Sequence, residues 1–116
     1  MIVKDIPGIS TEHSRRILEL FTSLPTGSEV WVFGSRAKGT YREGSDIDLA
    51  IKGSGVSLSL KERSELLEKY ESVFLPWKLD IVAYDSIEDP QLRGHIDRVG
   101  VLVFRVTNPG PISKTG

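Results

Sequence analysis

The chain has 116 residues, with 15 Lys or Arg and 16 Asp or Glu, for a formal net charge of −1. This length suits one domain and is short for two, and the near-neutral charge argues against a broad nucleic-acid-binding surface. Because the chain has no cysteine, disulfides, zinc–thiolate sites and thiol catalysis are excluded. No apolar run approaches the roughly 20 residues that span a membrane, and no signal peptide is evident. We therefore expect a cytoplasmic protein without membrane contact.

A turn, a helix and a strand are predicted at the start of the chain. Pro7-Gly8 is a turn signal, and Ser10 or Thr11 can cap a helix that runs to about Leu24. A stripe of apolar residues at helical spacing supports this helix: Ile17, Leu18, Phe21 and Leu24. The apolar run at 30–33 then predicts the first strand, at 29–33.

Residues 30–51, VWVFGSRAKGTYREGSDIDLAI, contain the motif that carries the most chemistry. Asp46 and Asp48 lie two apart at the start of a predicted second strand, about 46–52, so their side chains share one face. Two neighbouring carboxylates repel, and each raises the pKa of the other. Such a pair calls for a cation, and hard oxygen ligands of this kind suit Mg²⁺ or Mn²⁺.

The turn before these carboxylates is typical of a phosphate cradle. Gly34 allows a tight turn and a close approach of the backbone to a ligand, and Ser35 adds a hydroxyl and a backbone N–H. A strand, a small-residue turn and a short helical start present several N–H groups to a phosphate. We count Arg36 with Gly34 and Ser35 as nucleotide-binding, for charge stabilisation on a triphosphate. The alternative for Arg36 is a place in a solvated basic loop.

A helix and a third strand follow. Ser59 and Glu62 form a capping box that opens a helix running to about Phe74. Residues 78–84 predict a strand in which Asp80 interrupts an apolar run, and a lone carboxylate there is costly unless it is paired or metal-bound. Because a strand–helix–strand unit makes its strands parallel, Asp80 should arrive at the sheet end that carries Asp46. The ordinary alternative for Asp80 is a strand-end residue bonded to the backbone.

The last elements are a helix from Asp89-Pro90 to about Arg98 and a short strand at 101–106. His95 lies on this helix, where a packing or surface role is the ordinary one. Residues 107–116 have no periodicity and predict a disordered tail. The expected organisation is one domain at 1–106 followed by this tail.

Gly34-Ser35, ten intervening residues and Asp46-x-Asp48 together resemble the signature of the minimal nucleotidyltransferases of the DNA polymerase β superfamily. The likeness continues to about Phe104. It implies an α/β, polymerase-β-like nucleotidyltransferase fold, with a small mixed sheet of three to four strands flanked by helices. It also implies two metal ions, Mg²⁺ with Mn²⁺ as a substitute, held by Asp46, Asp48 and Asp80 as catalytic residues.

The resemblance further implies a reaction and a partner. Stand-alone minimal members of the family resemble antitoxins whose partner is a helical HEPN-type ribonuclease. The implied function is transfer of AMP from ATP to a tyrosine hydroxyl of that toxin. Two alternatives stay open: a binding module that neutralises a partner by contact, and an adenylyltransferase acting on a small molecule.

Overall fold

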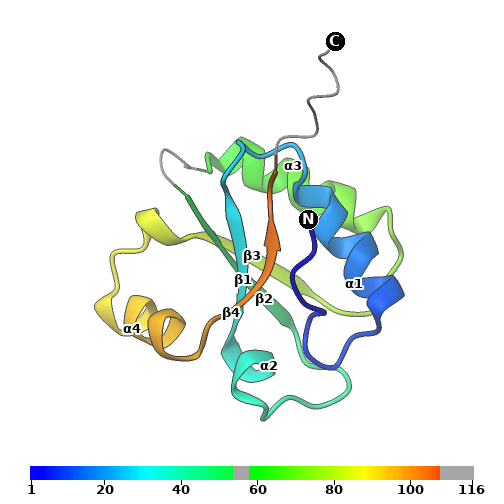
Figure 1. The fold of residues 1–116 in the computed structure, drawn as a ribbon, viewed down its shortest axis with the longest axis horizontal. Coiled ribbons are helices and arrows are strands. Elements are labelled where there is room, and N and C mark those ends of the chain that lie inside the picture. The colour runs from blue at the N-terminus through cyan, green and yellow to red at the C-terminus, as the bar shows by residue number, and fades with distance from the viewer. Residues whose placement is uncertain (54–57, 108–116) are drawn as a thin grey trace.

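A computed structural model describes residues 1–53 and 58–107 of the chain (Figure 1). Within these residues the sheet has four strands in the order β3-β2-β1-β4. β1 runs antiparallel to β2 and to β4, and β2 runs parallel to β3. The bounds are β1 (Glu29–Phe33), β2 (Ile47–Lys52), β3 (Leu79–Ala83) and β4 (Val101–Arg105). The predicted α/β fold with a small mixed sheet is confirmed, while the predicted tail lies, from residue 108 on, outside the described residues.

Helices cover both faces of this sheet. In Figure 1, α1 and α3 lie on one face, α4 lies on the other, and α2 lies at one end of the strands. The bounds are α1 (Thr11–Leu18), the 3₁₀ turn η1 (Glu19–Phe21), α2 (Gly34–Lys38), α3 (Leu60–Glu71), the 3₁₀ turn η2 (Tyr84–Ser86) and α4 (Pro90–Val99). No helix in the described part of the chain has both the length and the apolar character needed to cross a membrane.

Two predicted helices end earlier than expected. The first was expected to reach Leu24, but α1 ends at Leu18 and continues as a 3₁₀ turn, with a bond from Leu24 N to Phe21 O of 3.1 Å. α3 ends at Glu71, and Phe74 N bonds to Glu71 O at 3.2 Å. In both cases the last turn tightens to i→i+3 bonds, which satisfy carbonyls that the helix leaves without partners.

The main core lies between the sheet and the helices α1 and α3. The alternation along β2 turns Ile47, Leu49 and Ile51 into this core, as the period of two predicts. A smaller cluster under α4 contains Phe33, Ala50 and Ile96. The capping box at the start of α3 is present, with reciprocal bonds between Ser59 and Glu62 of 3.0 Å each.

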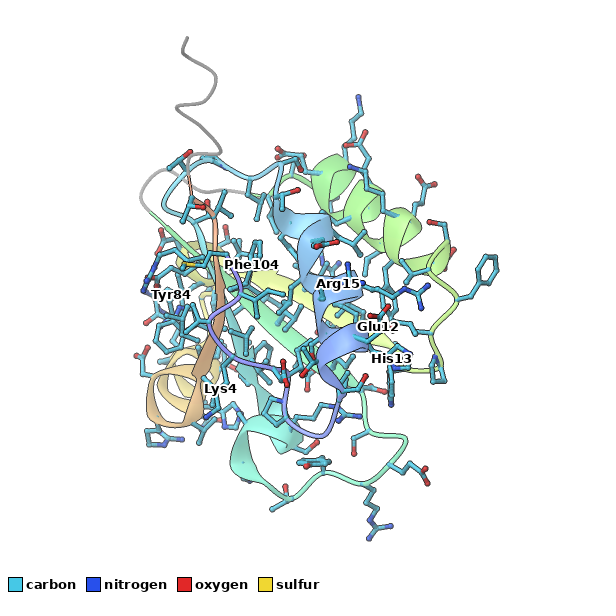
Figure 2. The ribbon with its side chains drawn as sticks, turned by 45° about the vertical axis from the view of Figure 1, so that its right-hand side comes forward. Lys4, Glu12, His13, Arg15, Tyr84 and Phe104 are labelled. Carbon is cyan, nitrogen blue, oxygen red and sulfur yellow. The ribbon has the colours of Figure 1, made fainter. Side chains whose placement is uncertain are left out.

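α4 is joined to the sheet by a polar cluster at the end of β3 remote from Asp80. The Tyr84 hydroxyl donates to Asp97 Oδ1 at 2.7 Å, and Lys52 Nζ lies 4.6 Å from the Tyr84 ring centroid. Figure 2 places Tyr84 on the α4 side of the molecule and His13 on the α1 side. The sheet therefore has its larger hydrophobic core on one face, and a face lined partly by polar residues on the other.

Phe74 has a strained backbone and a side chain that is 90% exposed. Its φ is 56°, in the left-handed region that costs a bulky residue about 1–2 kcal/mol. We expect Phe74→Asn to raise the free energy of unfolding by about 1 kcal/mol, because asparagine tolerates this region and little burial is lost.

Urea unfolding measures this effect. The control is Leu60→Asn, which removes another exposed apolar side chain, 82% exposed, without relieving a left-handed backbone. A Phe74→Asn variant no more stable than the wild type would show that the backbone conformation carries no such strain.

Candidate functional site

The parallel pairing of β2 and β3 brings two carboxylates to the same end of the sheet. Asp48 and Asp80 are direct register partners, and Ile47 N bonds to Lys78 O at 2.8 Å where the two strands begin. The predicted parallel arrangement of these strands is confirmed. Asp46 is exposed and lies one residue before β2, so it precedes the strand that was expected to include it.

The turn at Gly34 packs directly against Asp48. Phe33, the last residue of β1, is the register partner of Asp48, and α2 begins at the next residue. Gly34 has a φ of +74°, and a Cβ atom at this position would collide with Asp48 Oδ2. Glycine is therefore required here for its backbone conformation and for the close approach. The short helical start predicted after the strand is present.

His95 holds this turn from α4, a contact that the sequence did not reveal. The Gly34 N–H donates to His95 Nε2 at 3.0 Å. The His95 and Phe33 rings pack edge to face, with their centroids 6.1 Å apart. An accepting Nε2 places the proton of a neutral imidazole on Nδ1. His95 therefore has a packing role, as expected, but at the turn beside Asp48. Its 61-residue separation from Gly34 leaves no local signal for this contact.

The electrostatic environment of Asp48 favours the presence of a cation. Burial raises the pKa of the Asp48 carboxyl, and the charges of Asp80 and Asp46 raise it further. The positive charge of Arg36 acts in the opposite direction and has a smaller influence on this pKa. A divalent cation beside these carboxylates would relieve the repulsion that this pKa shift reflects.

Asp80 is engaged by Arg63, a residue of α3 that no sequence motif marked. Arg63 Nη2 donates to Asp80 Oδ1 at 2.8 Å, and Arg63 Nε donates to Ile81 O at 2.6 Å. In the described part of the chain, no three His, Cys, Asp or Glu side chains are arranged to hold a metal ion. The donor set Asp46, Asp48 and Asp80 nevertheless has the hard oxygen chemistry that Mg²⁺ and Mn²⁺ prefer.

Arg36 is buried and bonded to the protein backbone, whereas the sequence predicted a contact with nucleotide. Its side chain is 2% exposed. Nη1 donates to Pro7 O at 2.9 Å, and Nη2 and Nε donate to Ser45 O at 2.8 and 3.3 Å. The guanidinium carbon also lies 5.2 Å from the Tyr41 ring centroid. Arg36 thus ties the loop that precedes Asp46 to the N-terminal turn, and a direct contact with nucleotide stays a prediction.

Comparisons with known proteins agree with this geometry. The family described as polymerase beta, nucleotidyltransferase matches residues 15–108. A Haemophilus influenzae protein named "Probable protein adenylyltransferase MntA" is 32% identical over 95 residues, which cover 82% of each chain. A solved toxin–antitoxin structure with AMP-PNP has a TM-score of 0.65 at 27% identity, over 79% of this chain and 73% of that one. A mutant MntA–HpeT toxin–antitoxin structure has a TM-score of 0.63 at 26% identity, over 79% and 72%.

Proposed function

Because the chain belongs to the polymerase beta nucleotidyltransferase family, we propose that it transfers AMP from ATP to a hydroxyl of a partner protein. The acceptor is a tyrosine of a HEPN-type toxin, so that the chain acts as its antitoxin. The observation that carries the chemistry is the pairing of Asp48 with Asp80 beside the Gly34 turn. A protein acceptor is supported by the name of the Haemophilus influenzae relative, a probable protein adenylyltransferase, and a toxin partner by the toxin–antitoxin structure with AMP-PNP.

In this proposal the three carboxylates would hold two divalent ions, Mg²⁺ or Mn²⁺. When bound, these ions would neutralise the triphosphate and lower the pKa of the acceptor hydroxyl. Asp46 and Asp48 would hold the ion next to the triphosphate, and both would serve the ion at the acceptor together with Asp80. Burial is the largest cause of the raised pKa of Asp48, and the charges of Asp80 and Asp46 come next, so the electrostatic interaction among the three carboxylates supports this assignment.

The remaining groups would position the reactants. The backbone at Gly34 and Ser35 would lie against the triphosphate, with His95 holding the turn in place through its bond to Gly34 N. Arg36 would contribute by fixing the loop that delivers Asp46. Asp80 could accept the proton of the acceptor hydroxyl. The hydroxyl oxygen then attacks the α-phosphorus in line, the bond from this phosphorus to the bridging oxygen breaks, and pyrophosphate leaves.

Intact mass spectrometry tests the acceptor. The chain is incubated with ATP, Mg²⁺ and a HEPN-type toxin encoded beside it, and both proteins are weighed. We expect the toxin to gain one or more AMP units, because a docked partner positions its hydroxyl near the α-phosphorus. Mutating the modified tyrosine to phenylalanine should remove that mass increase.

Two other outcomes would contradict the proposal in different ways. Inhibition of the toxin without a mass change would support the module that neutralises its partner by contact. Adenylylation of a small hydroxylated compound, with no modification of a helical partner, would support the small-molecule enzyme instead.

A further inference from the structure

Arg63 lies where the crossover helix α3 meets the edge strand β3. Both of its hydrogen bonds go to consecutive residues of that strand: Nη2 to the Asp80 carboxylate and Nε to the main-chain oxygen of Ile81. The second bond does not involve the carboxylate. The guanidinium is therefore anchored to the backbone of β3 independently of the direction in which the Asp80 side chain points.

This guanidinium neutralises one member of a crowded group of carboxylates. Within the described residues, Arg63 is the cation that forms an ion pair with Asp80. Asp80 in turn raises the pKa of its register partner Asp48. The two side chains of the ion pair are 38% and 44% exposed, so water and a dissolved cation can reach them.

We propose that Arg63 is a built-in counter-cation of Asp80, which a divalent metal ion must displace in order to use that carboxylate. The inference rests on the proposed function, in which Asp80 is a metal ligand. A carboxylate oxygen that accepts a bond from a guanidinium has a lone pair engaged, and the positive guanidinium repels an approaching cation. Arg63 thereby lowers the affinity of the site for metal and keeps Asp80 neutralised in its absence.

The anchor on Ile81 decides what happens when the metal binds. Asp80 can rotate toward the metal while the bond from Arg63 Nε to Ile81 O keeps the guanidinium on the strand edge. The guanidinium therefore stays beside Asp80 and competes with the metal ion for its carboxylate. Arg63 is a positioning residue that recaptures Asp80 whenever the metal leaves.

The test measures the binding of Mn²⁺ alone to the full chain. The electron paramagnetic resonance signal of the free ion reports how much Mn²⁺ stays unbound. Arg63→Met removes the charge and keeps an unbranched side chain. We expect it to tighten Mn²⁺ binding on the order of tenfold, as expected when a nearby positive charge is lost. Arg63→Lys keeps the charge and should stay within about threefold of the wild type. Raising the salt concentration should shrink the difference between Arg63→Met and the wild type.

Asp80→Asn provides the control, because the effect of Arg63→Met should vanish in that background. Arg63→Gln serves as a second neutral variant, whose amide can still donate to Ile81 O, if Arg63→Met does not fold. Unchanged or weaker Mn²⁺ binding by the folded neutral variant, with Asp80→Asn weakening binding, would overturn this inference and leave the proposed function standing. Mn²⁺ binding that is indifferent to Asp80→Asn would remove Asp80 from the metal ligands, which overturns that part of the proposed function and the inference with it.

Discussion

The double variant Asp46→Asn/Asp48→Asn should lose Mg²⁺-dependent ATP binding and transfer AMP at least ~100-fold more slowly, the scale expected when charge stabilisation of a transition state is removed. Asparagine keeps the size of each side chain but removes the charge that a divalent ion requires. Calorimetry with ATP, in Mg²⁺ and in chelator, measures the binding, and intact mass measures the transfer. The wild type should bind ATP only in the presence of the metal.

The matched control removes two carboxylates at the other end of β3, as Asp85→Asn/Glu88→Gln. Both residues are exposed, so the control repeats the change in net charge away from the site. Equal loss of ATP binding in the two double variants would show that the change in net charge, and not the loss of the site, weakens ATP binding. Equal ATP affinity of the wild type in Mg²⁺ and in chelator would refute the site.

The same active-site variant should be more stable than the wild type at neutral pH. The folded state raises the pKa of Asp48 above its ordinary value of 3.8, through burial first and then through Asp80 and Asp46. The ionised form is therefore disfavoured in the folded state, and this destabilisation is fully present above the folded pKa. As the pH falls through that pKa toward 3.8, the folded state takes up the proton first and the destabilisation disappears. Thermal unfolding should show the advantage of the variant shrinking over this range.

Arg36→Ala should be the most destabilising single substitution that we describe, costing about 3 kcal/mol of unfolding free energy. The variant leaves the carbonyls of Pro7 and Ser45 without their donor and opens a cavity where a side chain 2% exposed had packed. Arg36→Lys keeps the charge but cannot reproduce the fork of donors, so we expect it to cost about 1–2 kcal/mol. Urea unfolding measures both losses.

Arg42→Ala is the control for this prediction, since Arg42 is exposed on the loop that contains Ser45 and should change stability by less than about 0.5 kcal/mol. Measuring ATP affinity separates two roles for Arg36. An Arg36→Ala variant of unchanged stability that has lost ATP binding would return the guanidinium to the direct nucleotide contact predicted from the sequence.

Local patterns in the amino-acid sequence by themselves determined the main elements of the fold and the motif that identifies the family. The alternation after Asp46 specifies which side chains of β2 enter the core, because successive side chains of a strand point to opposite faces. The capping box at Ser59 and Glu62 marks the start of α3, and the strand–helix–strand order makes β2 and β3 parallel. These signals depend on residues close together in the chain. The spacing from Gly34-Ser35 to Asp46 and Asp48 likewise identified the family.

Only the tertiary structure decided which polar groups meet around the carboxylates. The bonds from Gly34 to His95, from Arg36 to Pro7 and from Arg63 to Asp80 join residues 61, 29 and 17 positions apart. Periodicity indicates the face on which a side chain lies, but the partner of a long cationic side chain depends on how separate elements pack. Arg36 followed a turn that suited phosphate, yet folding placed two carbonyls within its reach and buried it between them. Arg63 carried no motif, and the crossing of α3 over the edge of β3 brought it to Asp80.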